Sequence, residues 1–197
     1  MDYPTAASLA LYSLAQSITP GPNNIMLASS GSFFGFRRTV PHMIGVTFGA
    51  TVMFVLAGVG LGTVFEEYPV LRTGLKIFGA GYLLYLAWKL WSAAGTLGTS
   101  AGRPFGFWQA AGFQFVNPKA WLIVLPALAA FIDPSAPMVS ELALLCVIFA
   151  LVNLPSVASW ALLGAGVRVL LSKEENLRLF NRIMAALTAA TAVLLLM

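Results

Sequence analysis

Two interrupted apolar segments contain the residues of this chain whose types and spacing could do chemistry. The first interruption is Thr19-Pro20-Gly21-Pro22-Asn23, and the second is Asn117-Pro118-Lys119. Proline inside a long apolar segment favours a break, after which a new half-helix begins with unpaired backbone N–H groups. In hydrocarbon those groups need a partner, and the positive end of the helix dipole favours an anion. The pattern therefore predicts a site at the breaks that attracts an anion.

Lys119 adds a positive charge to this site, because it is the only charged residue well inside an apolar segment. A lysine at the centre of a membrane helix costs about 2.5–3.5 kcal/mol to insert, and no carboxylate is expected at that depth to neutralise it. An incoming carboxylate would satisfy both the ammonium group and the half-helix that begins at Pro118. Two alternatives are open. The side chain could extend to the cytoplasmic surface, or a cluster of backbone carbonyl groups could bind the ammonium.

Amide side chains in the apolar segments could bind the other end of a zwitterionic ligand. Asn23, Asn24 and Asn153 each lie near a proline, and their oxygen atoms could accept hydrogen bonds from an ammonium group. The same side chains could equally link helices to one another, which is the role expected for Gln16 and Gln114.

His42 is the only histidine of the chain. An interfacial position suits it better than a proton relay, although His42 and Lys119 are the titratable groups available for proton coupling. A single histidine and a single cysteine, Cys146, exclude a histidine-based zinc site and a disulfide framework. The sequence has no phosphate-binding P-loop and no serine-hydrolase motif, so neither a metal nor a cofactor is expected.

Composition places these residues in a membrane. Hydrophobic residues make up 59% of the 197 residues and charged residues 9%, against about 25% charged residues in a soluble domain. This balance excludes a soluble globular enzyme, a disordered protein and a nucleic-acid-binding protein. A span needs about 20 apolar residues, so the stretches predict an all-α polytopic protein. Six spans are expected, at residues 4–36, 41–65, 71–91, 105–132, 139–171 and 180–197.

The basic residues predict the orientation of these spans. Most of them lie in the connections after the first, third and fifth spans, including a charged loop at 173–178, whereas acidic residues gather on the opposite side. Because positively charged loops stay in the cytoplasm, both termini are expected outside. The basic residues on the cytoplasmic side are Arg37, Arg38, Lys89, Arg103, Arg168, Lys173, Arg178 and Arg182.

The two breaks also indicate an internal repeat. Pro20 and Pro118 are 98 residues apart, and each lies in the first apolar segment of its half of the chain. Three spans per half make the second half enter the membrane from the opposite side, as in inverted repeats whose broken helices form a substrate site. We therefore expect a single transmembrane domain over 1–197, with one repeat at about 1–92, a loop at 93–104 and a second repeat at 105–197. Gly45 and Gly49 predict close helix packing.

Three segments resemble the lysine exporter (LysE) superfamily, and most closely its threonine/homoserine exporter (RhtB-type) branch. They are Thr19 to Asn23, the segment Phe78 to Trp88, and Phe105 to Phe107 followed by Phe113 to Ala120 with Asn117-Pro118-Lys119. The resemblance covers essentially the whole chain. It implies a bacterial cytoplasmic-membrane protein that exports amino acids or close analogues, driven by the proton gradient. It also implies that Pro20, Gly21, Pro22 and Asn23 belong to the site, together with Asn117, Pro118 and Lys119.

These observations together predict an alternating-access exporter of neutral amino acids such as threonine, homoserine or leucine-like substrates. Lys119 and the half-helix at Pro118 would bind the carboxylate, and Asn23, Asn24 and Asn153 would bind the amino group or line the path. A passive channel or facilitator is the alternative within transport, and a membrane-embedded enzyme or a scaffold subunit is the alternative outside it. The expected partners are an amino-acid substrate and the lipid bilayer, and a homodimer is plausible.

Overall fold

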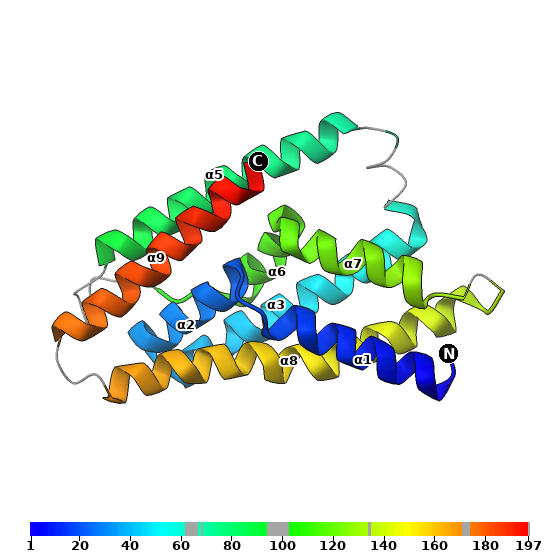
Figure 1. Ribbon diagram of the computed structural model, residues 1–197, viewed down its shortest axis with the longest axis horizontal. Coiled ribbons are helices and arrows are strands. Elements are labelled where there is room, and N and C mark those ends of the chain that lie inside the picture. The colour runs from blue at the N-terminus through cyan, green and yellow to red at the C-terminus, as the bar shows by residue number, and fades with distance from the viewer. Residues whose placement is uncertain (62–66, 68, 94–102, 134, 171–173, 197) are drawn as a thin grey trace.

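The computed structural model describes residues 1–61, 67, 69–93, 103–133, 135–170 and 174–196. Helices account for most of this part of the chain, and it contains no β-strand (Figure 1). An all-α fold is therefore confirmed. The helices are α1 (Tyr3–Ile18), α2 (Pro22–Phe34), α3 (Phe36–Leu56), a π-helical turn η1 (Ala57–Leu61), α5 (Pro69–Ala93), α6 (Phe107–Val116), α7 (Pro118–Phe131), α8 (Met138–Leu170) and α9 (Glu174–Leu196).

Both predicted breaks are present. Helix α1 ends at Ile18, and α2 begins at Pro22 with Gly21 as its N-cap. Helices α6 and α7 are separated by Asn117 alone and meet at a bend of 71°. Proline has no N–H to lose at the first helical position, so the residue before it serves as the cap and the preceding helix stops there. The new helices thus start at Pro22 and Pro118, whereas Pro20 lies within the first break.

Several helices are long and apolar enough to cross a membrane. Among the described residues, Phe36–Gly60 and Met138–Val167 meet this criterion as continuous helices, and the bent pair α6–α7 adds a third if it is one span. Helices α5 and α9 occupy the third and sixth predicted segments and lie side by side (Figure 1). Pro155 does not interrupt α8, so Asn153 lies within a continuous helix.

The predicted polar connections are shorter than expected. Only Gly35 separates α2 from α3, with a φ of 81° that favours glycine, so Arg37 and Arg38 lie in the first turn of α3 rather than in a loop. Helix α9 begins at Glu174, which makes residues 174–178 helical and places Arg178 and Arg182 on the helix. Charged residues have adequate helix propensity, so a helix can continue past the apolar segment into water. The predicted end of the second span, residues 62–65, lies outside the described residues.

Glycines allow two helix pairs to pack with their backbones in contact. A Cβ atom added at Gly164 of α8 would lie 1.8 Å from the carbonyl oxygen of Ala28 in α2, and one at Gly31 would lie 2.2 Å from that of Ala161. Gly45 and Gly49 of α3 approach α6 in the same way, at 2.3 and 2.5 Å from carbonyl oxygens. The predicted close packing at Gly45 and Gly49 is confirmed, and α2 is fixed against α8.

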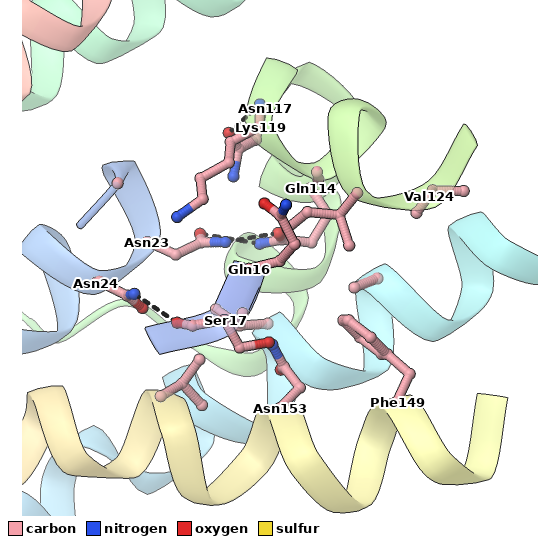
Figure 2. A pocket seen from close by; sticks show the side chains of 16 residues that line it. Gln16, Ser17, Asn23, Asn24, Gln114, Asn117, Lys119, Val124, Phe149 and Asn153 are labelled. Atoms are coloured by element: carbon pink, nitrogen blue, oxygen red, sulfur yellow. Dashed lines mark hydrogen bonds between the residues drawn. The ribbon is translucent and has the colours of Figure 1, made fainter. Parts of the chain in front are cut away.

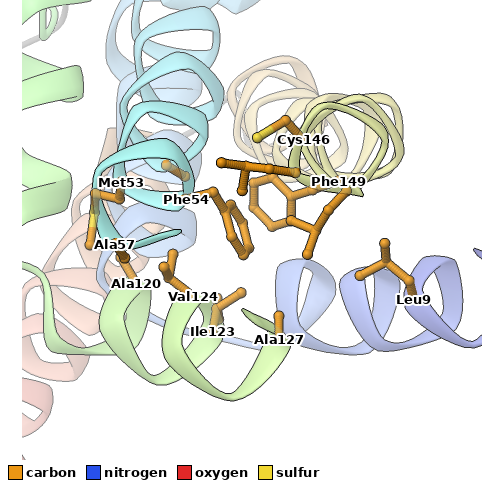
Figure 3. Close-up of a cluster of buried hydrophobic side chains, with 13 residues drawn as sticks. Leu9, Met53, Phe54, Ala57, Ala120, Ile123, Val124, Ala127, Cys146 and Phe149 are labelled. Carbon is orange, nitrogen blue, oxygen red and sulfur yellow. The ribbon is translucent and has the colours of Figure 1, made fainter. Parts of the chain in front are cut away.

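A buried apolar cluster supports the region beside the breaks (Figure 3). It joins α1, α3, α7 and α8, and at its centre the rings of Phe54 and Phe149 pack edge to face with centroids 4.9 Å apart. Glu141 is buried in the first turn of α8 and forms an ion pair with the N-terminal ammonium group of Met1. The cluster therefore anchors α1, which ends at the first break, and α7, which begins at the second.

Candidate functional site

A pocket lies at the two breaks, and we call it the break pocket (Figure 2). It encloses about 440 Å³ of space, its open mouth included. Residues of α1, α2, α3, α6, α7 and α8 line it, so both halves of the chain contribute. Polar residues gather around the breaks, and the apolar lining residues come from α3, α7 and α8. The lining residues are Gln16, Ser17, Gly21, Asn23, Asn24, Val46, Ala50, Gln114, Asn117, Lys119, Ala120, Ile123, Val124, Phe149, Asn153 and Val157.

Lys119 extends from the second break to the first. Its Nζ atom donates hydrogen bonds to the carbonyl oxygen of Thr19 at 2.8 Å, to the Thr19 hydroxyl at 2.9 Å and to the carbonyl oxygen of Pro20 at 3.2 Å. Gly21 leaves room for this path, because a Cβ there would lie 2.7 Å from Cδ of Lys119. The ammonium group therefore lies at the negative end of α1, where a helix dipole stabilises a cation. Carbonyl binding, one of the two alternatives open from the sequence, is what the structure shows.

Two more side chains donate to the carbonyl groups at the end of α1. The amide of Asn24 donates to the carbonyl oxygens of Ser17 and Thr19 at 2.7 and 2.8 Å. The indole N–H of Trp160 in α8 donates to the carbonyl oxygen of Ile18 at 3.1 Å. The last carbonyl groups of a helix have no partner within it. Side chains from α2, α7 and α8 thus bond to the carbonyl groups that follow from the end of α1.

Asn23 connects the first break to α6. Its amide exchanges two hydrogen bonds with that of Gln114, at 2.8 and 3.1 Å, and Gln114 also donates to the carbonyl oxygen of Ala110 at 2.8 Å. Asn23 and Lys119 each occupy the second helical position after an N-cap, in α2 and α7 respectively. Each of these residues therefore contacts the opposite half of the chain.

Asn153 joins three helices beneath the break pocket. Its amide nitrogen donates to the hydroxyl of Ser17 at 2.9 Å, and its oxygen accepts from the hydroxyl of Thr47 at 2.8 Å. Asn153 is buried, so both bonds fix α1, α3 and α8 relative to one another. A helix-linking role and a position on the pocket wall are both present at this residue.

The N-termini of α2 and α7 differ in how many of their backbone N–H groups remain without a hydrogen bond. In α7, Asn117 accepts from the backbone N–H of Lys119 through its side chain, at 3.1 Å, and from that of Ala120 through its carbonyl oxygen, at 3.0 Å. In α2, Gly21 has no side chain to cap the helix, and the backbone N–H groups of Asn23 and Asn24 make no hydrogen bond within the described part of the chain. The free N–H groups that a ligand could use are therefore those of α2.

Most of the predicted site residues come together here. Gly21, Asn23, Asn24, Asn117, Lys119 and Asn153 line the pocket, and the three prolines shape the breaks. His42 is not on the pocket wall. It is buried on α3 with its ring 5.3 Å from that of Phe105 and with neither ring nitrogen hydrogen-bonded among the described residues, and its depth near the membrane interface stays a prediction.

Sequence reasoning missed four polar residues of the site. Gln16, Ser17 and Gln114 line the pocket, and Thr19 binds Lys119. Gln16 and Gln114 were expected only to link helices, and the pairing of Gln114 with Asn23 shows that one residue can do both. The position of Ser17 and Thr19 within a turn of the first break was the signal available for them.

Broken helices that meet at a partly polar pocket, together with helices long and apolar enough to cross a membrane, are typical of polytopic membrane transporters. The chain matches the family described as "LysE type translocator" over residues 14–197. It therefore belongs to the LysE type translocator family, and it is a membrane-bound amino-acid efflux transporter rather than an enzyme.

Similar proteins include the cysteine/O-acetylserine efflux proteins of several enterobacteria. The chain is 35% identical to that of Klebsiella pneumoniae over 166 residues, which cover 82% of this chain and 83% of the relative. It is 32% identical to those of Salmonella typhimurium and Escherichia coli K12 over 154 residues, 78% of each chain. No solved structure matches the chain significantly.

Proposed function

We propose that the chain is an alternating-access exporter built from two inverted repeats of three spans, within one transmembrane domain and with both termini outside. Equivalent helix starts support the repeat, because Gly21-Pro22 and Asn117-Pro118 cap and begin the two half-helices. The helix contacts support it too, since α3 packs on α8 and α5 on α9. In such a fold the broken helices lie near the membrane midplane and form the substrate site.

The substrate carboxylate binds at Lys119 in this proposal. The observation that carries it is the ammonium group of Lys119, which lies on the pocket wall among uncharged acceptors. Asn23 and Asn24, whose backbone N–H groups are free among the described residues, also line the pocket and bring the positive end of α2 to it. We thus place the carboxylate between Lys119 and the start of α2, rather than at the start of α7, whose first N–H groups are already bonded.

The substrate amino group binds on the amide side of the pocket. The carboxamide oxygen of Asn24 accepts no hydrogen bond from the described residues, whereas those of Asn23 and Asn153 accept one each. Asn24 is therefore the first acceptor we assign to the ammonium group, with Asn23 and Asn153 beside it. No acidic side chain lines the pocket among the described residues, which favours a substrate with a neutral side chain.

Cysteine and O-acetylserine are the first candidate substrates. Both have a small uncharged side chain that suits the apolar wall of Val46, Ala50 and Phe149, and the similar efflux proteins carry these two names. Threonine and homoserine, which the sequence resemblance implies, meet the same requirements of charge and size. A single panel of these four amino acids with leucine and lysine distinguishes the possibilities, and lysine is expected to fail.

Proton coupling remains a proposal that rests on Lys119 and His42. Lys119 is the titratable group on the wall of the pocket, and His42 is buried outside it. If Lys119 carries the proton, the pH dependence of export disappears in Lys119→Met. The comparison variant His42→Asn then keeps the pH dependence. The reverse result assigns the coupling to His42.

Transport by Lys119→Met protein in proteoliposomes tests the carboxylate site. We expect the affinity for L-cysteine to fall at least about thirtyfold, because a buried charge that loses its partner costs about 2 kcal/mol or more. Arg38→Met, in the first turn of α3, is the matched control, since its exposed side chain does not line the pocket. Unchanged binding and counterflow of every substrate in Lys119→Met would refute the site.

Counterflow also separates an exporter from a passive channel. A carrier exchanges labelled for unlabelled substrate faster than it carries out net flux, and it saturates at its site. A channel shows no such acceleration.

We also propose that the protein forms a homodimer. Crosslinking of the purified protein in the membrane tests this, and a single band at the monomer mass would contradict it.

A further inference from the structure

The ammonium group of Lys119 has three protons, and all three are used in this structure. The acceptors are two backbone carbonyl oxygens, of Thr19 and Pro20, and one side-chain hydroxyl, of Thr19. An ammonium group has no further donor to offer. A substrate carboxylate can therefore gain a direct hydrogen bond from Lys119 only by replacing one of these three acceptors.

The three acceptors differ in how easily they can be replaced. The carbonyl groups are part of the backbone at the end of α1, where Asn24 also donates to the oxygen of Thr19. The hydroxyl is on a single rotatable side chain, and Thr19 is exposed. Its own proton is donated to the carbonyl oxygen of Gln16 at 3.0 Å, so its lone pair faces Lys119. The hydroxyl is the one acceptor that can leave without moving the backbone.

We propose that the Thr19 hydroxyl is a resting ligand of Lys119 that the substrate carboxylate displaces, which makes Thr19 a positioning residue that sets substrate affinity. This inference rests on the proposed carboxylate site at Lys119. A carboxylate is charged and forms shorter and stronger bonds to an ammonium group than a neutral hydroxyl does. Without substrate, the hydroxyl satisfies the third proton, and the side chain stays at the first break.

The proposal predicts that removal of a hydroxyl group from the site raises the affinity for the substrate. If the hydroxyl competes with the carboxylate, its removal strengthens substrate binding. If Thr19 merely holds Lys119 in place for the substrate, its removal weakens binding. Thr19→Val keeps the size and the branched shape of the side chain and leaves both carbonyl acceptors. The expected result is a three- to tenfold lower Kd for L-cysteine, the usual range for about one hydrogen bond.

Isothermal titration calorimetry on the purified protein, with L-cysteine under reducing conditions, measures this Kd. Thr19→Ser should bind as the unchanged chain does, because the hydroxyl is restored. Thr191→Val is the matched control, since its hydroxyl also bonds to a backbone carbonyl oxygen, of Leu187, on a helix away from the pocket. L-cysteinamide, which lacks the carboxylate, should bind equally to Thr19→Val and to the unchanged chain.

An equal or higher Kd for L-cysteine in Thr19→Val would overturn the proposal, as would an equal gain with L-cysteinamide. Thr19→Ala is the second variant without the hydroxyl, and whichever of the two folds with a normal melting temperature decides the sign. Lys119→Met identifies the other failure. If it binds L-cysteine normally, the proposed carboxylate site is wrong and the role of Thr19 falls with it. If Lys119→Met loses binding and the Thr19 variants without the hydroxyl do not bind more tightly, the carboxylate site stands and the displacement of the hydroxyl by substrate is wrong.

Discussion

Gly21→Ala tests whether the position of Lys119 matters for transport, with little disturbance of the fold. The backbone of Gly21 is extended, with a φ of −177° and a ψ of 176°, so alanine adopts it without strain. The added Cβ would lie 2.7 Å from Cδ and 3.1 Å from Nζ of Lys119. Its three nearest atoms all belong to Lys119, so the closest clash is with one flexible side chain and folding should survive.

The size of the effect follows from these distances. Ordinary van der Waals contact begins at 3.4 Å, so Cδ of Lys119 must move back from its 2.7 Å position by several tenths of an ångström. The bond to Pro20 is already 3.2 Å long and is lost with such a shift, and the bonds of 2.8 and 2.9 Å to Thr19 are lengthened to the limit. A hydrogen bond to a charged group contributes about 1.5 kcal/mol or more. The two carbonyl bonds hold the ammonium at the carboxylate site, whereas the bond to the Thr19 hydroxyl is the one that the substrate displaces. We therefore expect about a tenfold loss of L-cysteine affinity for each carbonyl bond that the displaced ammonium can no longer form.

The assay is L-cysteine counterflow in proteoliposomes together with the melting temperature of the purified protein. Gly112→Ala is the matched control, because a Cβ there meets nothing within 4 Å. A second comparison places Gly21→Ala in a Lys119→Ala background, where the clash no longer exists and the two changes should not add. Wild-type transport by Gly21→Ala, or an equal further loss in the Lys119→Ala background, would refute the argument.

Two further predictions concern the framework of the site. Gly164→Leu should lower the melting temperature sharply and reduce the amount of folded protein, because its side chain would collide with the backbone of Ala28, whereas Gly166→Leu has open space and should be tolerated. An equal effect of both substitutions would show that the contact between α2 and α8 is unimportant. Asn117→Ala removes the cap of α7 and should reduce stability by about 1 kcal/mol in chemical denaturation. Asn117→Ser should restore most of it, and a full loss in both variants would argue against capping.

The sequence was sufficient to locate the breaks because the signals there are local. Proline fixes its own dihedral and lacks an N–H, and an asparagine before it can cap the new helix, so Asn117 and Pro118 predict a helix start from two residues. Helix ends near charged residues were not predictable in the same way. Arg37 and Glu174 were assigned to connections because they are charged, yet each lies in a helix. A charged residue indicates contact with water, but it does not show where a helix ends.

The partners of Lys119 could not be chosen from the sequence for a different reason. Its acceptors are mainly backbone carbonyl oxygens, which every residue has, and they become available only because α1 ends at Ile18. The choice between a surface position and a carbonyl cluster depends on the distance between two segments 100 residues apart. The same is true of Gln114, whose pairing with Asn23 requires α2 and α6 to meet.

The chemistry of the substrate explains why the two halves of the pocket differ. An amino acid is a zwitterion, so two identical half-sites would bind it equally well in either direction. The equivalent positions after the two N-caps are occupied by Asn23 in α2 and Lys119 in α7. One offers an amide that both donates and accepts, and the other offers a charge that only donates. The ammonium of Lys119 crosses to the carbonyl groups of Thr19 and Pro20 at the first break, whereas the amide of Asn23 pairs with that of Gln114 in α6. The double variant Asn23→Lys, Lys119→Asn exchanges these two residues. It should therefore bind the substrate in the reverse orientation and should not transport it as the unchanged chain does.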